Sequence, residues 1–180
     1  MLKFLRYFKS FRREEDGAAT VEFVILFPAF IAILLSSYES GLMMVRNVML
    51  ERGVDLAVRD LRLGQPVPPT FDQLKTSICD NAMIVDDCFD KIQIELQPID
   101  MVTFNMPTTQ PRCIDVNSTI DPIDDTTFVG GGNNELMLVR VCALLDPFFP
   151  STVLGMQMPE YDEGRYALIV NSAFVNEPSR

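Results

Sequence analysis

The chain has 180 residues, with 25 acidic and 15 basic side chains, a net charge of −10 and no histidine. This acidic surplus repels nucleic acid phosphates, so we expect no nucleic-acid partner. The lack of histidine excludes Ser-His-Asp and Cys-His catalytic groups and every zinc site that contains histidine. Because no nucleophile with an accompanying base can be assembled, we predict that the chain is not an enzyme and needs no cofactor.

The charge is distributed unevenly along the chain. Residues 1–17 hold five basic and three acidic side chains, whereas the remainder holds 10 basic and 22 acidic ones. By the positive-inside rule, this basic head belongs on the cytoplasmic side of a membrane. Residues 18–44 follow it, and they are long and apolar enough for a transmembrane helix, which needs about 20 residues.

Two residues interrupt the apolar run 21–35, namely Glu22 and Pro28. We expect Pro28 to bend the helix without ending the span. Glu22 is costly, because a carboxylate in hydrocarbon is disfavoured by about 2.5–3.5 kcal/mol on insertion scales. Further along, Glu39 is expected near the outer end of the span, close to water.

The helix is predicted to continue beyond the membrane. Apolar residues recur on one helical face at Leu50, Val54, Ala57, Val58 and Leu61. Gly64 and Pro66 then supply a helix stop. One helix over about 18–63 results, with residues 18–44 in lipid and residues 45–64 outside it. Residues 65–180 form the globular domain.

The globular domain is predicted to begin with a helix and continue with strands. Thr70 and Gln73 have the spacing of a capping box, which predicts a helix over 71–81. Alternating apolar residues predict a strand around 92–96, and further strands are predicted over 136–145 and 165–175. Residues 98–134 have loop composition. The fold class is therefore α+β, a long N-terminal helix packed on a small antiparallel sheet.

Four cysteines follow the apolar run, with no C-x-x-C pair among them. Zinc ribbons and thioredoxin-like motifs need closer pairs, so two disulfides in an oxidising compartment are the better interpretation. Four cysteines allow three pairings. We favour Cys79–Cys88, which closes a short loop between helix and strand, with Cys113–Cys142, which ties the long loop to the central strand.

Two acidic clusters could suggest calcium, which takes grouped oxygen ligands. They are Asp86, Asp87 and Asp90, and Asp121, Asp124 and Asp125. Neither follows the spacing of a calcium-binding loop, so solvated loop acids are the preferred interpretation and no metal site is predicted. The triplet 117–119 matches a glycosylation acceptor, a pattern that is common by chance.

The start of the chain differs from an ordinary secretory signal. Such a signal has a short basic head and small residues after its apolar core. Here the head is long and the small residues come before the core. The arrangement resembles the class III signal of type IV pilin-like proteins, in which a prepilin peptidase cuts after a glycine and the fifth mature residue is glutamate. That resemblance implies cleavage between Gly17 and Ala18, with Glu22 as the fifth mature residue and 1–17 as a removed leader.

The match extends to a narrower group. The segment "GAATVEFVILFPAFIAILL" resembles the N-terminus of TadE/TadF-like pseudopilins of the tight-adherence (Flp, type IVc) pilus system. The segments "LVRVCALLDPFFP" and "GRYALIVNSAFVNEPSR" are similar to the closing strands of the same family. The resemblance implies a type IV pilin-like fold. Because the chain is far longer than a major Flp pilin, the resemblance implies a minor or accessory subunit that acts in pilus assembly and surface adhesion.

The implied partners are the prepilin peptidase, other pilins and pseudopilins, the pilus assembly platform and membrane lipid. The implied location is the bacterial inner membrane, with a periplasmic C-terminal domain that could become extracellular in the pilus. Glu22 would pair with the α-amine of a neighbouring subunit, or else it reaches water near the interface and caps the helix start. Two alternatives remain. One is a single-pass anchor that carries a periplasmic binding or adaptor module, and the other is a secreted protein cleaved near Ser37 or Ser40.

Overall fold

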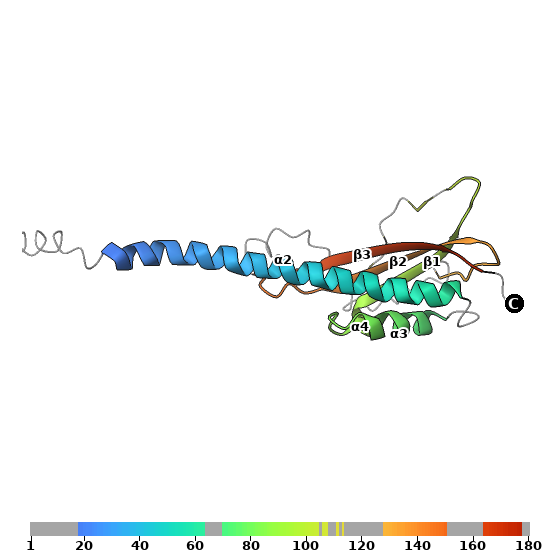
Figure 1. Ribbon diagram of the computed structural model, residues 1–180, viewed down its shortest axis with the longest axis horizontal. Coiled ribbons are helices and arrows are strands. Elements are labelled where there is room, and N and C mark those ends of the chain that lie inside the picture. Colours follow the sequence, from blue (N-terminus) through green and yellow to red (C-terminus); the bar gives the residue numbers. More distant parts are fainter. Residues whose placement is uncertain are drawn as a thin grey trace, which may run out of the picture.

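The computed structural model describes residues 18–63, 70–104, 106–107, 111, 113, 128–150 and 164–177. In chain order its elements are α2 (Ala18–Arg62), α3 (Phe71–Asn81), α4 (Cys88–Lys91), β1 (Ile92–Ile99), β2 (Leu136–Leu145) and β3 (Tyr166–Val175). The predicted α+β class is confirmed, with one long helix lying along a three-stranded antiparallel sheet (Figure 1). The expected leader with Gly17, the helix stop at Gly64 and Pro66, the second acidic cluster and the triplet 117–119 lie outside the described residues.

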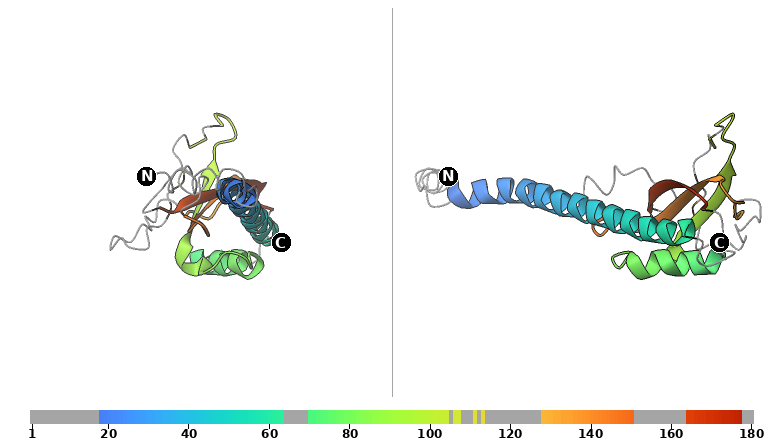
Figure 2. Two further views of the ribbon diagram at one scale, coloured as in Figure 1. Left: turned by 90° about the vertical axis from the view of Figure 1, so that its left-hand side faces the viewer. Right: turned by 45° about the vertical axis from the view of Figure 1, so that its right-hand side comes forward.

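Helix α2 has 45 residues and continues through Pro28. At 1.5 Å per residue it is about 68 Å long. Its N-terminal half projects away from the rest of the molecule, and its C-terminal half lies along the sheet (Figures 1 and 2). Arg59 and Arg62 occupy the last turn, where positive charge suits the negative end of the helix dipole.

The sheet has the strand order β1-β2-β3. In its register Ile94 lies opposite Val141, and Val141 lies opposite Val170, so these three side chains share one face. All three belong to the core. The residues predicted to pack on the sheet are buried there too, namely Leu50, Val54, Ala57, Val58 and Leu61. Burial of each leucine or valine in this set is worth about 1.5–3 kcal/mol, so this face fixes the helix to the domain.

Helix α3 begins with the predicted capping box. The Gln73 N–H donates to Thr70 Oγ1 at 3.4 Å, and the Thr70 N–H donates to Gln73 Oε1 at 3.3 Å. The helix buries Leu74 and Ile78. Its contact with α2 is very close at Gly53, where an added Cβ would lie 2.7 Å from the Ile78 carbonyl oxygen. Only a residue without a side chain permits this approach.

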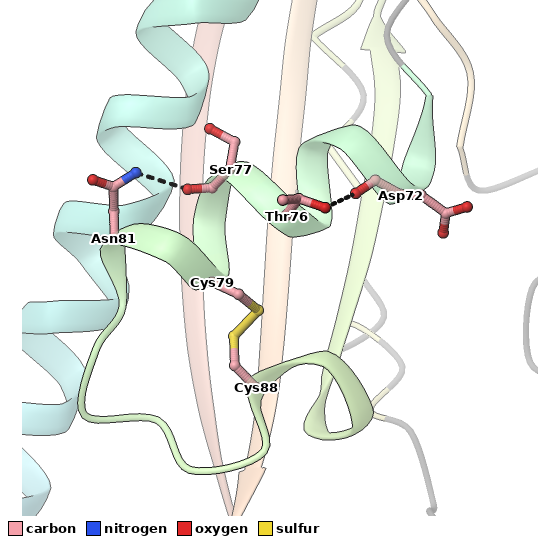
Figure 3. Close-up of a disulfide and its surroundings, with 6 residues drawn as sticks. All are labelled: Asp72, Thr76, Ser77, Cys79, Asn81 and Cys88. Atoms are coloured by element: carbon pink, nitrogen blue, oxygen red, sulfur yellow. Dashed lines mark hydrogen bonds between the residues drawn. A yellow bond between two sulfur atoms is a disulfide. The ribbon is translucent and has the colours of Figure 1, made fainter.

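Two disulfides are present, as the sequence predicts. Cys79 near the end of α3 is bonded to Cys88 at the start of α4 (Figure 3). The second disulfide joins Cys113 to Cys142 of β2. Both are the pairs favoured from the sequence. Helix α4 was not predicted, because four residues are too few to show a helical period.

The loop predicted from residue 98 starts later than expected. Strand β1 includes Pro98 and runs to Ile99, which lies opposite Leu136. Phe128 forms a parallel bridge with Leu96, and the Val129 N–H donates to the Leu96 carbonyl at 2.7 Å. The sheet therefore has one additional bridge beside β1.

Candidate functional site

The N-terminal half of α2 exposes large apolar side chains on every side. The exposed ones are Val21, Phe23, Val24, Ile25, Leu26, Phe27, Phe30, Ile33 and Leu34. Soluble proteins rarely leave such a continuous apolar surface in water, and a helix that is apolar all round is typical of a membrane span. By length and composition α2 can cross a membrane, and its most apolar stretch is not buried within the protein. The exposed N-terminal half of α2 is therefore the candidate functional surface.

Glu22 lies on this surface and is exposed. Among the residues that the structure describes, no hydrogen bond or ion pair reaches its carboxylate. Ala18 is the first residue of α2, so Ala18 and Glu22 are one helical turn apart. The apolar run 21–35 of α2 therefore presents one acidic group on its surface.

Glu39 departs from its expected position near water. Its side chain is fully buried, and its two carboxylate oxygens each accept a hydrogen bond. Oε1 accepts from the Phe148 N–H and Oε2 from the Phe149 N–H, both at 2.9 Å. The expectation is wrong because the segment after β2 folds back onto α2 at this level. The contact joins residues more than a hundred positions apart, so no local pattern could have revealed it.

Arg46 lies two turns beyond Glu39 on the same face of α2. Its Nη1 donates to the Asp146 carbonyl at 3.1 Å and to the Tyr166 hydroxyl at 2.9 Å. Its Nη2 also forms an ion pair with Asp86 at 3.8 Å. Glu39 and Arg46 together hold residues 146–149 against the helix.

Three aromatic rings gather at the same level. The Tyr38 ring lies edge-on to Phe148 and Phe149, with centroid distances of 6.2 and 5.9 Å. The two phenylalanines are also in contact, at 5.0 Å. We call Tyr38, Phe148 and Phe149 the aromatic collar, because they lie where α2 meets the domain.

Two members of the first acidic cluster, Asp86 and Asp87, form ion pairs. Asp86 pairs with Arg46, and Asp87 pairs with Lys91 at 3.9 Å. Lys91 also pairs with Asp146 at 3.4 Å. Within the described ranges, no group of three or more metal-binding side chains occurs. Asp86 therefore links the turn before α4 to α2, and Lys91 links α4 to the segment after β2.

Comparison with known proteins gives one finding. No curated protein and no solved structure matches the chain. One family model matches part of the chain. The matched segment begins at Gly17, includes Glu22, Glu39 and Arg46, and ends before the sheet. Residues 17–59 match the family model described as TadE-like protein, which is consistent with a TadE-like protein of the tight-adherence pilus system.

Proposed function

We propose that the chain is a minor pseudopilin, an accessory subunit of a tight-adherence (Flp-type) pilus that acts in pilus assembly and surface adhesion. The observation that carries the proposal is the coincidence of the family match over 17–59 with the exposed apolar half of α2. In this proposal the protein is a structural subunit, and its apolar helix makes the contacts to lipid and to neighbouring subunits.

The proposed organisation has four parts. Residues 1–17 are a leader that a prepilin peptidase removes, and residues 18–44 cross the inner membrane. Residues 45–64 are the outer half of the helix, and residues 65–180 form the periplasmic domain. The basic head supports this orientation, since an excess of Lys and Arg marks the cytoplasmic side. The two disulfides support an oxidising compartment for the domain.

Cleavage after Gly17 would give Glu22 a role. It would free an α-amine on Ala18, a group that can carry a positive charge. An exposed carboxylate on the apolar half of one subunit could then pair with the α-amine of the next. The pair would offset the cost of holding either charge in lipid. Partners would be other pilins and pseudopilins and the assembly platform in the membrane.

One other function has support in the structure. A single-pass anchor with a periplasmic adaptor domain would have the same apolar helix and the same disulfides. It would give no reason for Gly17 or for Glu22 on the apolar surface.

Mass spectrometry of the mature N-terminus separates these functions. We expect the protein from wild-type cells to begin at Ala18, and the protein from cells without prepilin peptidase to begin at Met1. The matched control is Gly17→Leu, which should retain the leader even when the peptidase is present. A wild-type protein that begins at Met1 would support the permanent anchor, and one that begins near Tyr38 would support a secreted protein.

A further inference from the structure

The segment after β2 combines exposed aromatic surface with a backbone whose donors are all satisfied. Phe148 is 60 % exposed, and Tyr38 beside it is 52 % exposed. Pro147 and Pro150 have no N–H to donate. The N–H groups of Phe148 and Phe149 both donate to Glu39. Residues 147–150 therefore have no free backbone N–H.

That property matters near lipid. An unsatisfied backbone N–H in hydrocarbon costs several kcal/mol, and loops with free donors avoid that region. On most loop surfaces the donors are satisfied by water, so a carboxylate that binds two consecutive donors is not required there. Here a fully buried Glu39 performs this task directly beneath an exposed Phe148.

The position along α2 fits the edge of a bilayer. A hydrocarbon core of about 30 Å is spanned by about 20 helical residues at 1.5 Å each. Counted from Ala18, the first residue of α2, the hydrocarbon part of the span ends near Ser37, and residues 38–44 of the 18–44 segment lie at the level of the headgroups. Tyr38 follows, with the ring of Phe148 beside it, at the level where tyrosine and tryptophan are enriched in membrane proteins. The collar thus continues the apolar surface of α2 sideways onto the domain.

We propose that Phe148, with Tyr38, is a second membrane contact, in which the segment 147–150 lies at the outer edge of the hydrocarbon core and fixes the domain against the bilayer. Glu39 is the positioning residue that makes the segment compatible with this environment. The inference rests on the proposed function, in that α2 must span the membrane. It adds that the domain itself touches lipid.

The chain has no tryptophan, so single tryptophan variants report the depth of one site each. The full chain would be reconstituted into phosphatidylcholine vesicles brominated either at shallow or at deep positions of the acyl chains, since bromine quenches nearby tryptophan. We expect Phe148→Trp to be quenched by the shallow lipid more than by the deep one, with emission shifted to the blue.

The matched control is Phe104→Trp. Phe104 is also 60 % exposed, but it follows the end of β1 that lies farthest from the projecting half of α2 (Figure 1). Neither lipid should quench it. Phe30→Trp reports on the span itself and should be quenched by the deep lipid. Phe149→Trp is a second reporter on the same segment, and it should show the same shallow profile if Phe148→Trp fails to fold.

The outcomes are distinct. If Phe30→Trp is quenched while Phe148→Trp behaves like Phe104→Trp, the span stands and the second membrane contact is wrong. Blue-shifted Phe148→Trp emission that depends on protein concentration and not on bromine would show that the collar binds another protein chain, and it would also overturn the inference. If Phe30→Trp is not quenched, the proposed function fails first.

Discussion

Glu39 and Arg46 are two charged side chains that join the long helix to the segment after β2. Glu39 accepts hydrogen bonds from two consecutive amides, and Arg46 donates to the Asp146 carbonyl and to Tyr166. Hydrogen bonds to charged groups are worth about 1.5–3 kcal/mol each, more than bonds between neutral groups. These side chains, and not apolar packing alone, therefore set the position of the collar on α2.

Replacing Glu39 should destabilise the domain markedly. Glu39→Ala leaves the N–H groups of Phe148 and Phe149 without an acceptor, at a cost of about 1–3 kcal/mol for each. Glu39→Gln keeps one acceptor oxygen and should have an intermediate effect. The free energy of unfolding would be measured by urea titration of the full chain in detergent, followed by near-ultraviolet circular dichroism, which reports on the domain.

Glu51→Ala is the control for this series. Glu51 is an exposed acid on the same helix, whose carboxylate accepts a hydrogen bond from Asn47. Its replacement should change the free energy of unfolding by no more than about 0.5 kcal/mol. Equal stability of the Glu39→Ala and Glu51→Ala proteins would mean that the buried carboxylate does not hold the segment.

At the scale of elements, the sequence predicts the helices and strands whose signals lie in neighbouring residues. The apolar period of α2, the capping box of α3 and the strands at 136–145 and 165–175 each follow from neighbouring residues, and the structure confirms them within about one residue. The features that were missed depend on distant partners or on very short segments. They are the contact of Glu39, the bridge between Leu96 and Phe128, and the four residues of α4.

The candidate site divides in the same way. The apolar surface with Glu22 can be read from the sequence, because it needs no partner within the chain. The collar cannot, because Tyr38 and Phe148 are more than a hundred residues apart in the chain and come together only in the folded structure. A tyrosine or a phenylalanine in the sequence does not by itself show whether its side chain is buried or exposed in the folded protein.

The packing of α3 on α2 gives a prediction with an internal control. In Gly53→Ala the added methyl group would meet the Ile78 carbonyl oxygen, which belongs to the backbone and cannot move without shifting α3. Overpacking of this kind costs about 1–3 kcal/mol, which exceeds the gain of about 1 kcal/mol from the better helix propensity of alanine. We expect a lower free energy of unfolding in the same urea titration.

Gly41→Ala makes the same chemical change in the same helix. An added Cβ at Gly41 has no atom within 4 Å, so only the propensity of alanine acts. Its stability should be unchanged or higher by up to about 1 kcal/mol. If Gly53→Ala and Gly41→Ala change the free energy of unfolding alike, the close approach of α3 is not what excludes a side chain at position 53.

At the scale of the whole molecule, the long helix has two halves in different surroundings. The C-terminal half is fixed to the domain by the core and by Arg46, whereas the N-terminal half has apolar side chains exposed all round. Bundling of such halves from several subunits would bury apolar surface without deforming the domains. A charge within that bundle would then decide which subunits fit together, since an unpaired buried charge costs about 3–5 kcal/mol.

Glu22→Ala tests this idea. The substitution removes the charge that is costly in lipid, so the variant should insert at least as well as the wild type. It should also still be cut at Gly17, because the peptidase acts before Glu22 could meet a neighbour. It should nevertheless fail to join the pilus, because the α-amine of the adjacent subunit loses its partner. Three measurements are needed: the mature N-terminus, the amount in the membrane fraction, and co-purification with other pilus subunits after detergent extraction.

Glu51→Ala again serves as the control, because it removes one acidic charge from the same helix outside the apolar half. It should be processed, inserted and co-purified as the wild type is. Normal co-purification of Glu22→Ala would show that the carboxylate only caps the helix start, where it suits the dipole. A Glu22→Ala protein that is not processed would instead place the residue in recognition by the peptidase. Loss of co-purification with intact processing and insertion is the result that assigns Glu22 to assembly.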